Sequence, residues 1–167
     1  MKKYVPVWMM LATCLILAYK AAAQTDTLPY LKNTGMPALV FLNLDSTEFN
    51  TFHIEEGTYS VWIYFSPTCE HCEWLTQEII RHLDSFSKTE FYMISPVDLS
   101  VTRAFDKKYN ITGQPKMHLY KDAQHLFATY YGVRFLPFMV IYDKKKQLIK
   151  TAEGGMKIDE LIELTHP

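Results

Sequence analysis

The sequence has few cysteines, only three in 167 residues. Cys14 lies in the apolar stretch at the N-terminus, so the rest of the chain holds only Cys69 and Cys72, which two residues separate. A framework of stabilising disulfides is excluded, because a disulfide stabilises mainly by closing a long loop. A closed structural zinc site needs four ligands, and scattered histidines such as His82, His118 and His125 do not pair at ligand spacing. The two neighbouring cysteines are therefore expected to be chemical rather than structural.

The sequence also lacks an excess of positive charge. It has 17 basic and 18 acidic residues. Removal of residues 1–23, which hold three lysines and no acidic residue, changes the net charge from −1 to −4. A nucleic-acid partner is excluded, because it requires clustered positive charge. The chain has no internal repeat and no low-complexity tract. Its length suits one domain, and its hydrophobic content of 49% indicates a globular core.

The sequence also lacks an apolar run as long as the roughly 20 residues that a membrane-spanning helix needs. Residues 5–19 are almost wholly apolar, but Lys20 ends the run. Lys2 and Lys3 precede it, and three small residues, 21–23, follow it. This pattern predicts a signal peptide over residues 1–23, cleaved before Gln24, and hence a periplasmic or secreted protein. An uncleaved membrane anchor and a lipid anchor on Cys14 are the alternatives.

The remaining chain is expected to form a flexible entry segment, 24–35, and one domain, 36–167. Tyr59–Phe65 is a run rich in β-branched and aromatic residues, which predicts a strand buried on both faces. After a break at 66–68, apolar residues follow helical spacing from Cys69 to about Phe86. Further strands are predicted over 38–42, 91–94, 116–120, 138–142 and 147–152. Further helices are predicted through Tyr109 (capped by Asp98 or Ser100), over 123–131 (capped by Asp122) and over 159–165. This order predicts an α/β fold with a central mixed β-sheet flanked by helices on both faces.

The two cysteines therefore stand where a central strand ends and a helix begins. Unpaired N–H groups and the helix dipole favour negative charge on the Cys69 sulfur, and the thiolate is the reactive form of cysteine. Cys69 is expected to attack a substrate disulfide and Cys72 to resolve the mixed disulfide. A protonated His71 would favour the thiolate and a more oxidising couple, whereas Glu70 would oppose it. The alternative is that His71 has no influence on the reactivity of the thiols. No cofactor is expected.

In these motifs the sequence resembles the thioredoxin superfamily, above all the exported TlpA/ResA-like thiol–disulfide oxidoreductases of bacteria. The resemblance runs from about Met36 to the C-terminus. It rests on Trp62–Cys72, which contains the CxxC motif, and on Tyr131–Phe138, about 65 residues later. It implies that Pro137 is a cis proline facing the active site, and that the backbone of Leu136 pairs with an extended substrate. An ordinary edge-strand proline is the alternative.

Two departures from the family stand in the same stretch. Ile63 takes the place of a buried Asp that assists the resolving thiol in many thioredoxins. The possible substitute carboxylates are surface candidates only: Glu55, Glu56 and Glu73. Trp62 stands where peroxiredoxins carry a proline, so peroxiredoxin chemistry is disfavoured.

The resulting hypothesis is an exported, monomeric enzyme that exchanges disulfides with protein thiols. The resemblance implies a reductase that receives electrons from a membrane partner, and His71 leaves the oxidising direction open. Two other functions stay open at this point. One is a copper-delivery module that binds Cu(I) through Cys69, Cys72 and His71. The other is a scaffold in which the CxxC pair is merely oxidised.

Overall fold

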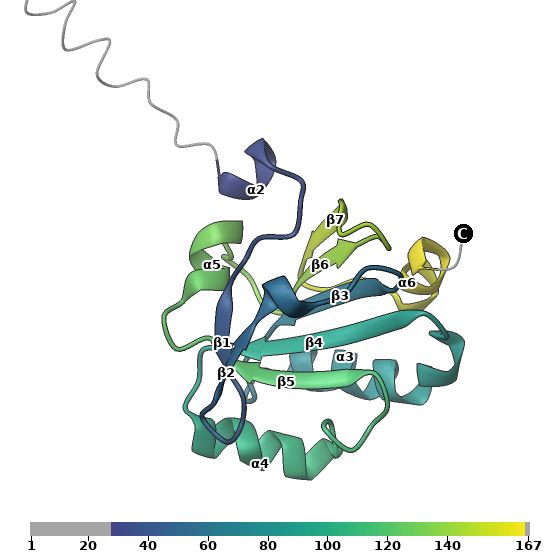
Figure 1. Ribbon diagram of the computed structural model, residues 1–167. Helices are drawn as coiled ribbons and strands as arrows, with labels where there is room; N and C mark the ends of the chain where they lie inside the picture. The colour runs from purple at the N-terminus through teal and green to yellow at the C-terminus, as the bar shows by residue number, and fades with distance from the viewer. Residues whose placement is uncertain (1–27, 166–167) are drawn as a thin grey trace, which may run out of the picture.

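The computed structural model describes residues 28–165, which form one seven-stranded mixed sheet (Figure 1). The signal peptide, Cys14 and the processing site lie outside the described residues. The strand order across the sheet is β2-β1-β5-β4-β3-β6-β7. The strands are β1 Val40–Leu42, β2 Glu48–Asn50, β3 Tyr59–Tyr64, β4 Thr89–Ser95, β5 Met117–Lys121, β6 Phe138–Tyr142 and β7 Leu148–Glu153.

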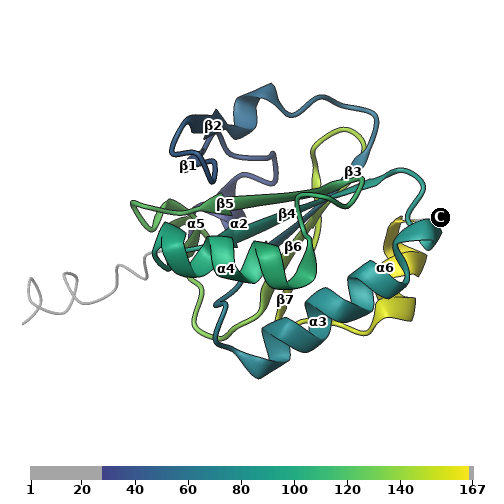
Figure 2. The ribbon, with the colours of Figure 1, turned by 90° about the horizontal axis from the view of Figure 1, so that it is seen from below.

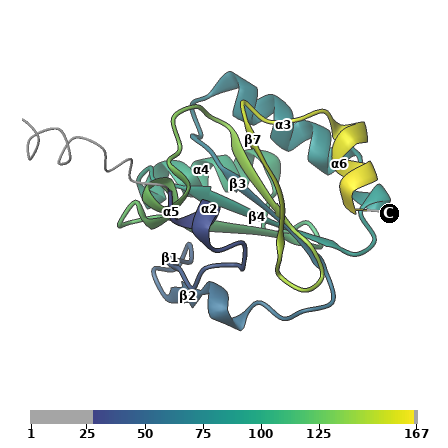
Figure 3. The same cartoon turned by 90° about the horizontal axis from the view of Figure 1, so that it is seen from above.

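Helices cover both faces of this sheet, which confirms the predicted α/β architecture (Figures 2 and 3). Helices α3, α4 and α6 lie on one face, and α2 and α5 on the other. The helices are α2 Pro29–Lys32, α3 Glu70–Arg81, α4 Leu99–Tyr109, α5 Leu126–Tyr131 and α6 Ile158–Thr165, with short 3-10 turns at Thr51–His53 and Leu83–Ser85. None of the helices within residues 28–165 has the length and apolar character needed to cross a membrane.

Strand β3 lies at the centre of the core. It pairs in parallel with β4 and antiparallel with β6, and all six of its residues are buried. Its alternate side chains divide between two clusters: Val61 and Ile63 face α3, whereas Trp62 and Tyr64 face α5. The strand therefore lies between two apolar layers, as its sequence rich in β-branched and aromatic residues predicts.

Most of the predicted helices and strands are present, but several begin or end at other residues than predicted. The CxxC helix ends at Arg81 rather than near Phe86, because a separate 3-10 turn at Leu83–Ser85 follows it. Helix α5 begins at Leu126 rather than Ala123, since His125 adopts a left-handed conformation with φ of 53°. Asp122 still caps the helix, because its carboxylate accepts hydrogen bonds from the backbone N–H groups of Leu126 and Phe127.

The stretch before Met36, for which the sequence predicts no regular element, holds the short helix α2 and packs on the domain. The Tyr30 ring lies 5.6 Å from that of Tyr131 in α5. Gly35 forms a bridge with Gln147, and the Thr34 carbonyl accepts a hydrogen bond from the Leu148 N–H. Aromatic contacts and cross-strand bonds between segments far apart in sequence leave no periodic signal, so the pattern alone did not reveal them.

Candidate active site

Cys69 occupies the N-cap of α3, directly after the loop that leaves β3. Its backbone is extended, with φ of −95° and ψ of 116°, and its N–H donates to the Ser66 carbonyl. Its sulfur accepts a hydrogen bond from the backbone N–H of Cys72 at 3.4 Å. An N-cap acceptor meets helix N–H groups that have no partner within the helix. The half-buried sulfur thus lies at the positive end of the helix, as the sequence predicts.

Cys72 lies one turn into α3 and is only 1% exposed. Burial raises the pKa of the Cys72 thiol to about 12, and the neighbouring Cys69 sulfur adds to the effect. Both cysteines are free thiols here. The helix therefore places one sulfur at the surface and holds its neighbour neutral beneath it.

Pro137 stands beside this helix start, and the peptide bond that joins it to Leu136 is cis. The pairing of Tyr64 with Phe138 sets Pro137 next to the end of β3, from which the CxxC loop departs. Gly155, between β7 and α6, lies between the proline loop and α3. A Cβ atom at that position would lie 3.3 Å from Pro137 and 3.6 Å from Leu75 of α3. The fold thus brings the proline loop and the CxxC helix together across a single glycine.

Glu70 and His71 are both exposed, and His71 lines three adjoining recesses with volumes of about 240, 450 and 490 Å³. One lies toward Trp74, a second extends to Gly154–Lys157, and the third reaches Phe135 and Leu136. The sequence does not predict that Phe135 and residues 154–157 lie at the site. The Gly154-Gly155 pair marks a chain break, but its position beside α3 depends on the β6–β7 hairpin.

None of the carboxylates suggested by the sequence lies against the Cys72 thiol in a buried position. Glu55 and Glu56 are exposed in a turn before β3. Glu73 bonds to Lys108 of α4 at 2.9 Å, and this hydrogen bond lowers the pKa of the Glu73 carboxyl. Within residues 28–165 the buried carboxylate is Asp122, whose pKa burial raises, and it serves as the cap of α5. Ile63 itself is buried in the core.

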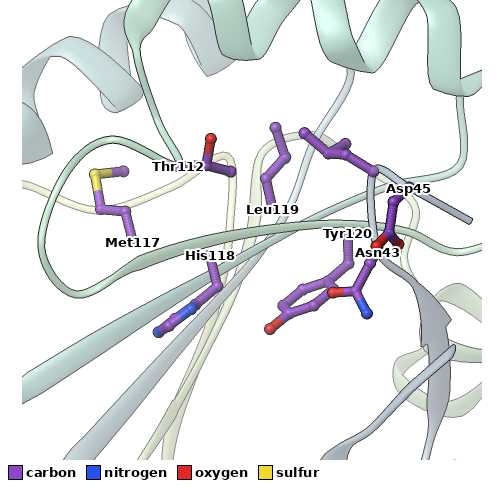
Figure 4. Close-up of a pocket in the computed structure, with 8 residues that line it drawn as sticks. Asn43, Asp45, Thr112, Met117, His118, Leu119 and Tyr120 are labelled. Atoms are coloured by element: carbon purple, nitrogen blue, oxygen red, sulfur yellow. The ribbon is translucent and has the colours of Figure 1, made fainter. Parts of the chain in front are cut away.

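Two further features bear on the chemistry of the site. Over residues 28–165, no three side chains of His, Cys, Asp or Glu gather closely enough to hold a metal ion. Another recess, of about 550 Å³, lies between the β1–β2 turn and β5, two strands away from β3 (Figure 4). Its lining includes Asp45, Thr112 and His118 but neither cysteine. The recesses nearest the two cysteines in sequence are the three lined by His71, which stands between them in the CxxC motif.

The family follows from comparison with known proteins. The family model for thioredoxin matches residues 40–132, which is more than half of the chain and includes β3, the CxxC loop and α3. The chain belongs to the thioredoxin family. No curated protein sequence matches this thioredoxin-family chain significantly.

Solved structures share the thioredoxin fold at low sequence identity. A secreted Mycobacterium tuberculosis disulfide oxidoreductase, homologous to E. coli DsbE, has a TM-score of 0.63 at 19% identity, covering 75% of this chain and 92% of that one. StoA from Bacillus subtilis has a TM-score of 0.62 at 15% identity, covering 78% of this chain and 97% of that one. A thiol-disulfide oxidoreductase from Bacteroides fragilis has a TM-score of 0.64 at 14% identity, covering 78% of this chain and 98% of that one. These similarities confirm the thioredoxin-like fold that the sequence predicts.

Proposed function

We propose that this protein is an exported thiol–disulfide oxidoreductase that reduces disulfides in protein substrates through Cys69 and Cys72. The observation that carries the proposal is the unequal placement of the two sulfurs. Cys69 lies half-buried at the helix N-cap and accepts a hydrogen bond from the N–H of Cys72, whereas the Cys72 thiol is buried. A nucleophile must be reachable and its partner must be protected until it is needed, and this arrangement meets both conditions.

The reaction proceeds by two thiol–disulfide exchanges. The Cys69 thiolate attacks one sulfur of the substrate disulfide and forms a mixed disulfide, and the other substrate sulfur leaves as a thiolate that takes up a proton. The Cys72 thiol then loses its proton and attacks the Cys69 sulfur. A Cys69–Cys72 disulfide forms, the second substrate sulfur leaves, and the substrate gains two electrons that the protein loses. Because the pKa of Cys72 is raised, this second step is expected to be the slow one.

The cis Pro137 and its neighbour Leu136 are proposed to bind the substrate. The loop lies beside the end of β3, and Leu136 lines a recess with His71. The backbone of Leu136 would pair with an extended substrate segment and hold its disulfide over Cys69. Glu70 and His71, both exposed, are proposed to tune the charge around the thiolate.

The setting of this reaction is proposed from the N-terminal sequence and from the related structures. Cleavage of residues 1–23 would release a periplasmic or secreted monomer, with residues 24–35 leading into the domain 36–167. The secreted M. tuberculosis oxidoreductase of the same fold supports export. The reducing direction requires a dithiol donor that returns two electrons to the Cys69–Cys72 disulfide, and we propose a membrane protein for this role.

Insulin reduction with dithiothreitol as electron source tests the activity. The chain 24–167 should accelerate insulin precipitation, and Cys69→Ser should abolish the acceleration. Cys72→Ser should instead accumulate a mixed disulfide with insulin, visible on a non-reducing gel, because the attacking sulfur remains while the resolving one is absent. A Cys69→Ser variant as active as the wild type would sink the proposal. Tight one-to-one Cu(I) binding without disulfide exchange would also overturn it, in favour of copper delivery.

A redox titration against glutathione tests the direction. A potential near that of thioredoxin, about −270 mV, agrees with a reductase, whereas one near about −120 mV indicates an oxidant. His71→Ala should lower the potential if the imidazole favours the Cys69 thiolate, since the reduced form then loses a stabilising charge.

A further inference from the structure

Two exposed aromatic side chains border the recesses around His71. Among the described residues, the large apolar side chains that are exposed number six. Two of them, Trp74 at 53% and Phe135 at 63%, line recesses that also include His71. They come from different elements, since Trp74 lies on α3 and Phe135 precedes the cis proline. Exposure of a large apolar side chain disfavours solubility, and a cluster of such side chains marks a contact surface.

The three recesses share a lining residue at the start of α3. His71, which stands between the two cysteines in sequence, lines all three. Gly154 lines two of them, and a Cβ at Gly154 would meet nothing within 4 Å, so the surface is open above this glycine. We call this surface, from Trp74 past His71 and Gly154 to Phe135, the aromatic groove.

The charges along the aromatic groove nearly cancel. Glu153 lies 3.5 Å from Arg134, which neutralises it. The other full charges in the lining are Glu70 at one rim and Lys157 at another, of opposite sign. A strongly charged ligand therefore finds no complementary field, whereas an uncharged apolar segment can cover Trp74 and Phe135 without removing an unpaired charge from water.

We infer that Trp74 and Phe135 determine substrate specificity by binding bulky apolar side chains on either side of the substrate cysteine. The inference rests on the proposed function and names its substrate class: extended, Cys-containing polypeptide segments with aromatic or large aliphatic neighbours. Such segments are buried in folded proteins and become exposed when the proteins are misfolded or incompletely folded. The groove thus directs the enzyme toward disulfides of unfolded chains.

Reduction of synthetic peptide disulfides tests the inference. Each peptide carries one cysteine in a mixed disulfide with glutathione, flanked on both sides by Phe, Leu, Ala, Glu or Lys, and the rate of reduction by the reduced 24–167 chain is followed. The Phe and Leu peptides should react about five- to tenfold faster than the Ala peptide, the effect of one or two apolar contacts. Trp74→Ala and Phe135→Ala should each reduce this preference severalfold, and Trp74→Phe should restore most of it.

Two controls keep the inference separate from the proposed function. Phe52→Ala removes an aromatic side chain that is 74% exposed but lies in the 3-10 turn after β2, and it should leave the preference unchanged. Oxidised glutathione, which has no apolar neighbour at its cysteine, should react with Phe52→Ala as fast as with the wild type. Loss of that reaction in the wild type contradicts the proposed function. Two outcomes overturn only the inference about the aromatic groove. In the first, the glutathione reaction is intact and all peptides react at equal rates. In the second, the Lys peptide reacts fastest and Glu70→Gln removes that preference.

Discussion

At the scale of single residues, the most consequential feature is the neutral thiol of Cys72. Its pKa in the folded reduced protein, about 12, lies above the ordinary value of 9.0. An acid whose pKa is raised by folding stabilises the native state fully below the ordinary pKa, and this contribution is lost as the pH rises through the folded value. The free energy of unfolding of reduced wild type, minus that of Cys72→Ala, should therefore decrease above about pH 9, by about 1.4 kcal/mol per pH unit.

Urea denaturation at a series of pH values measures this difference, and comparison of two variants cancels the tyrosines that titrate in the same range. The oxidised wild type provides the control, because its Cys72 has no proton to lose, and the corresponding difference should stay flat. A difference that also stays flat in the reduced protein would mean that solvent reaches the Cys72 sulfur.

The sequence predicts the positions of the two candidate cysteines better than the residues that surround them. The CxxC spacing is local, so it places Cys69 and Cys72 at the strand-to-helix junction without any long-range information. Trp74 could be placed on the same helix from periodicity. Phe135 and Gly154 lie more than 60 residues from the cysteines, and they reach the site only through the antiparallel pairing of β3 with β6 and of β6 with β7. Register between distant strands cannot be derived from the pattern of one chain.

At the scale of elements, helix α5 depends on a buried carboxylate. Asp122 is wholly buried and accepts hydrogen bonds from the N–H groups of Leu126 and Phe127, at 2.8 and 3.0 Å. Without it the N–H group of Phe127 would be buried and unpaired, and that of half-buried Leu126 would also lose its partner. This loss costs more than a lost surface contact. Asp122→Ala should lower the free energy of unfolding by about 2 kcal/mol, as measured by urea denaturation.

The chain offers a matched control in α4. Asp98 is the N-cap residue of α4, but its side chain makes no cap hydrogen bond and is largely exposed, with one ion pair to Lys121. Asp98→Ala should cost no more than about 0.5 kcal/mol, since exposed ion pairs contribute little. Equal losses in the two variants would show that the buried bonds of Asp122 are not what stabilises α5.

Element positions follow from the sequence where a single pattern decides them. The six buried residues of β3 and the alternation of its side chains between two clusters agree with the predicted doubly buried strand. The ends of α5 were less predictable, because its start depends on the left-handed backbone of His125, a conformation that no local rule requires of histidine. Its end at Gly132, with φ of 64°, agrees with the glycine stop.

At the scale of the whole molecule, the two faces of the sheet have separate tasks. One face carries α3 and the cysteines, and the other carries α5 with an aromatic cluster that includes Trp62, Phe127 and Tyr131. The segment that precedes β1 covers this second cluster. Leu28 lies so close to Gly132 that a Cβ there would come within 2.7 Å of its side chain, and Tyr30 packs on Tyr131.

This arrangement makes residues 28–35 part of the domain's stability but not of its chemistry. A chain that begins at residue 36 should be about 2 kcal/mol less stable to urea than one that begins at residue 24, because it loses the aromatic contact and the bonds to the β6–β7 hairpin. Tyr30→Ala should account for about half of the loss, whereas Leu31→Ala, at a largely exposed position, should cost little. The rate with oxidised glutathione should not change, since the cysteines lie on the opposite face. Equal stability of the two chains would show instead that the domain begins at Met36 and that the preceding residues are a dispensable leader.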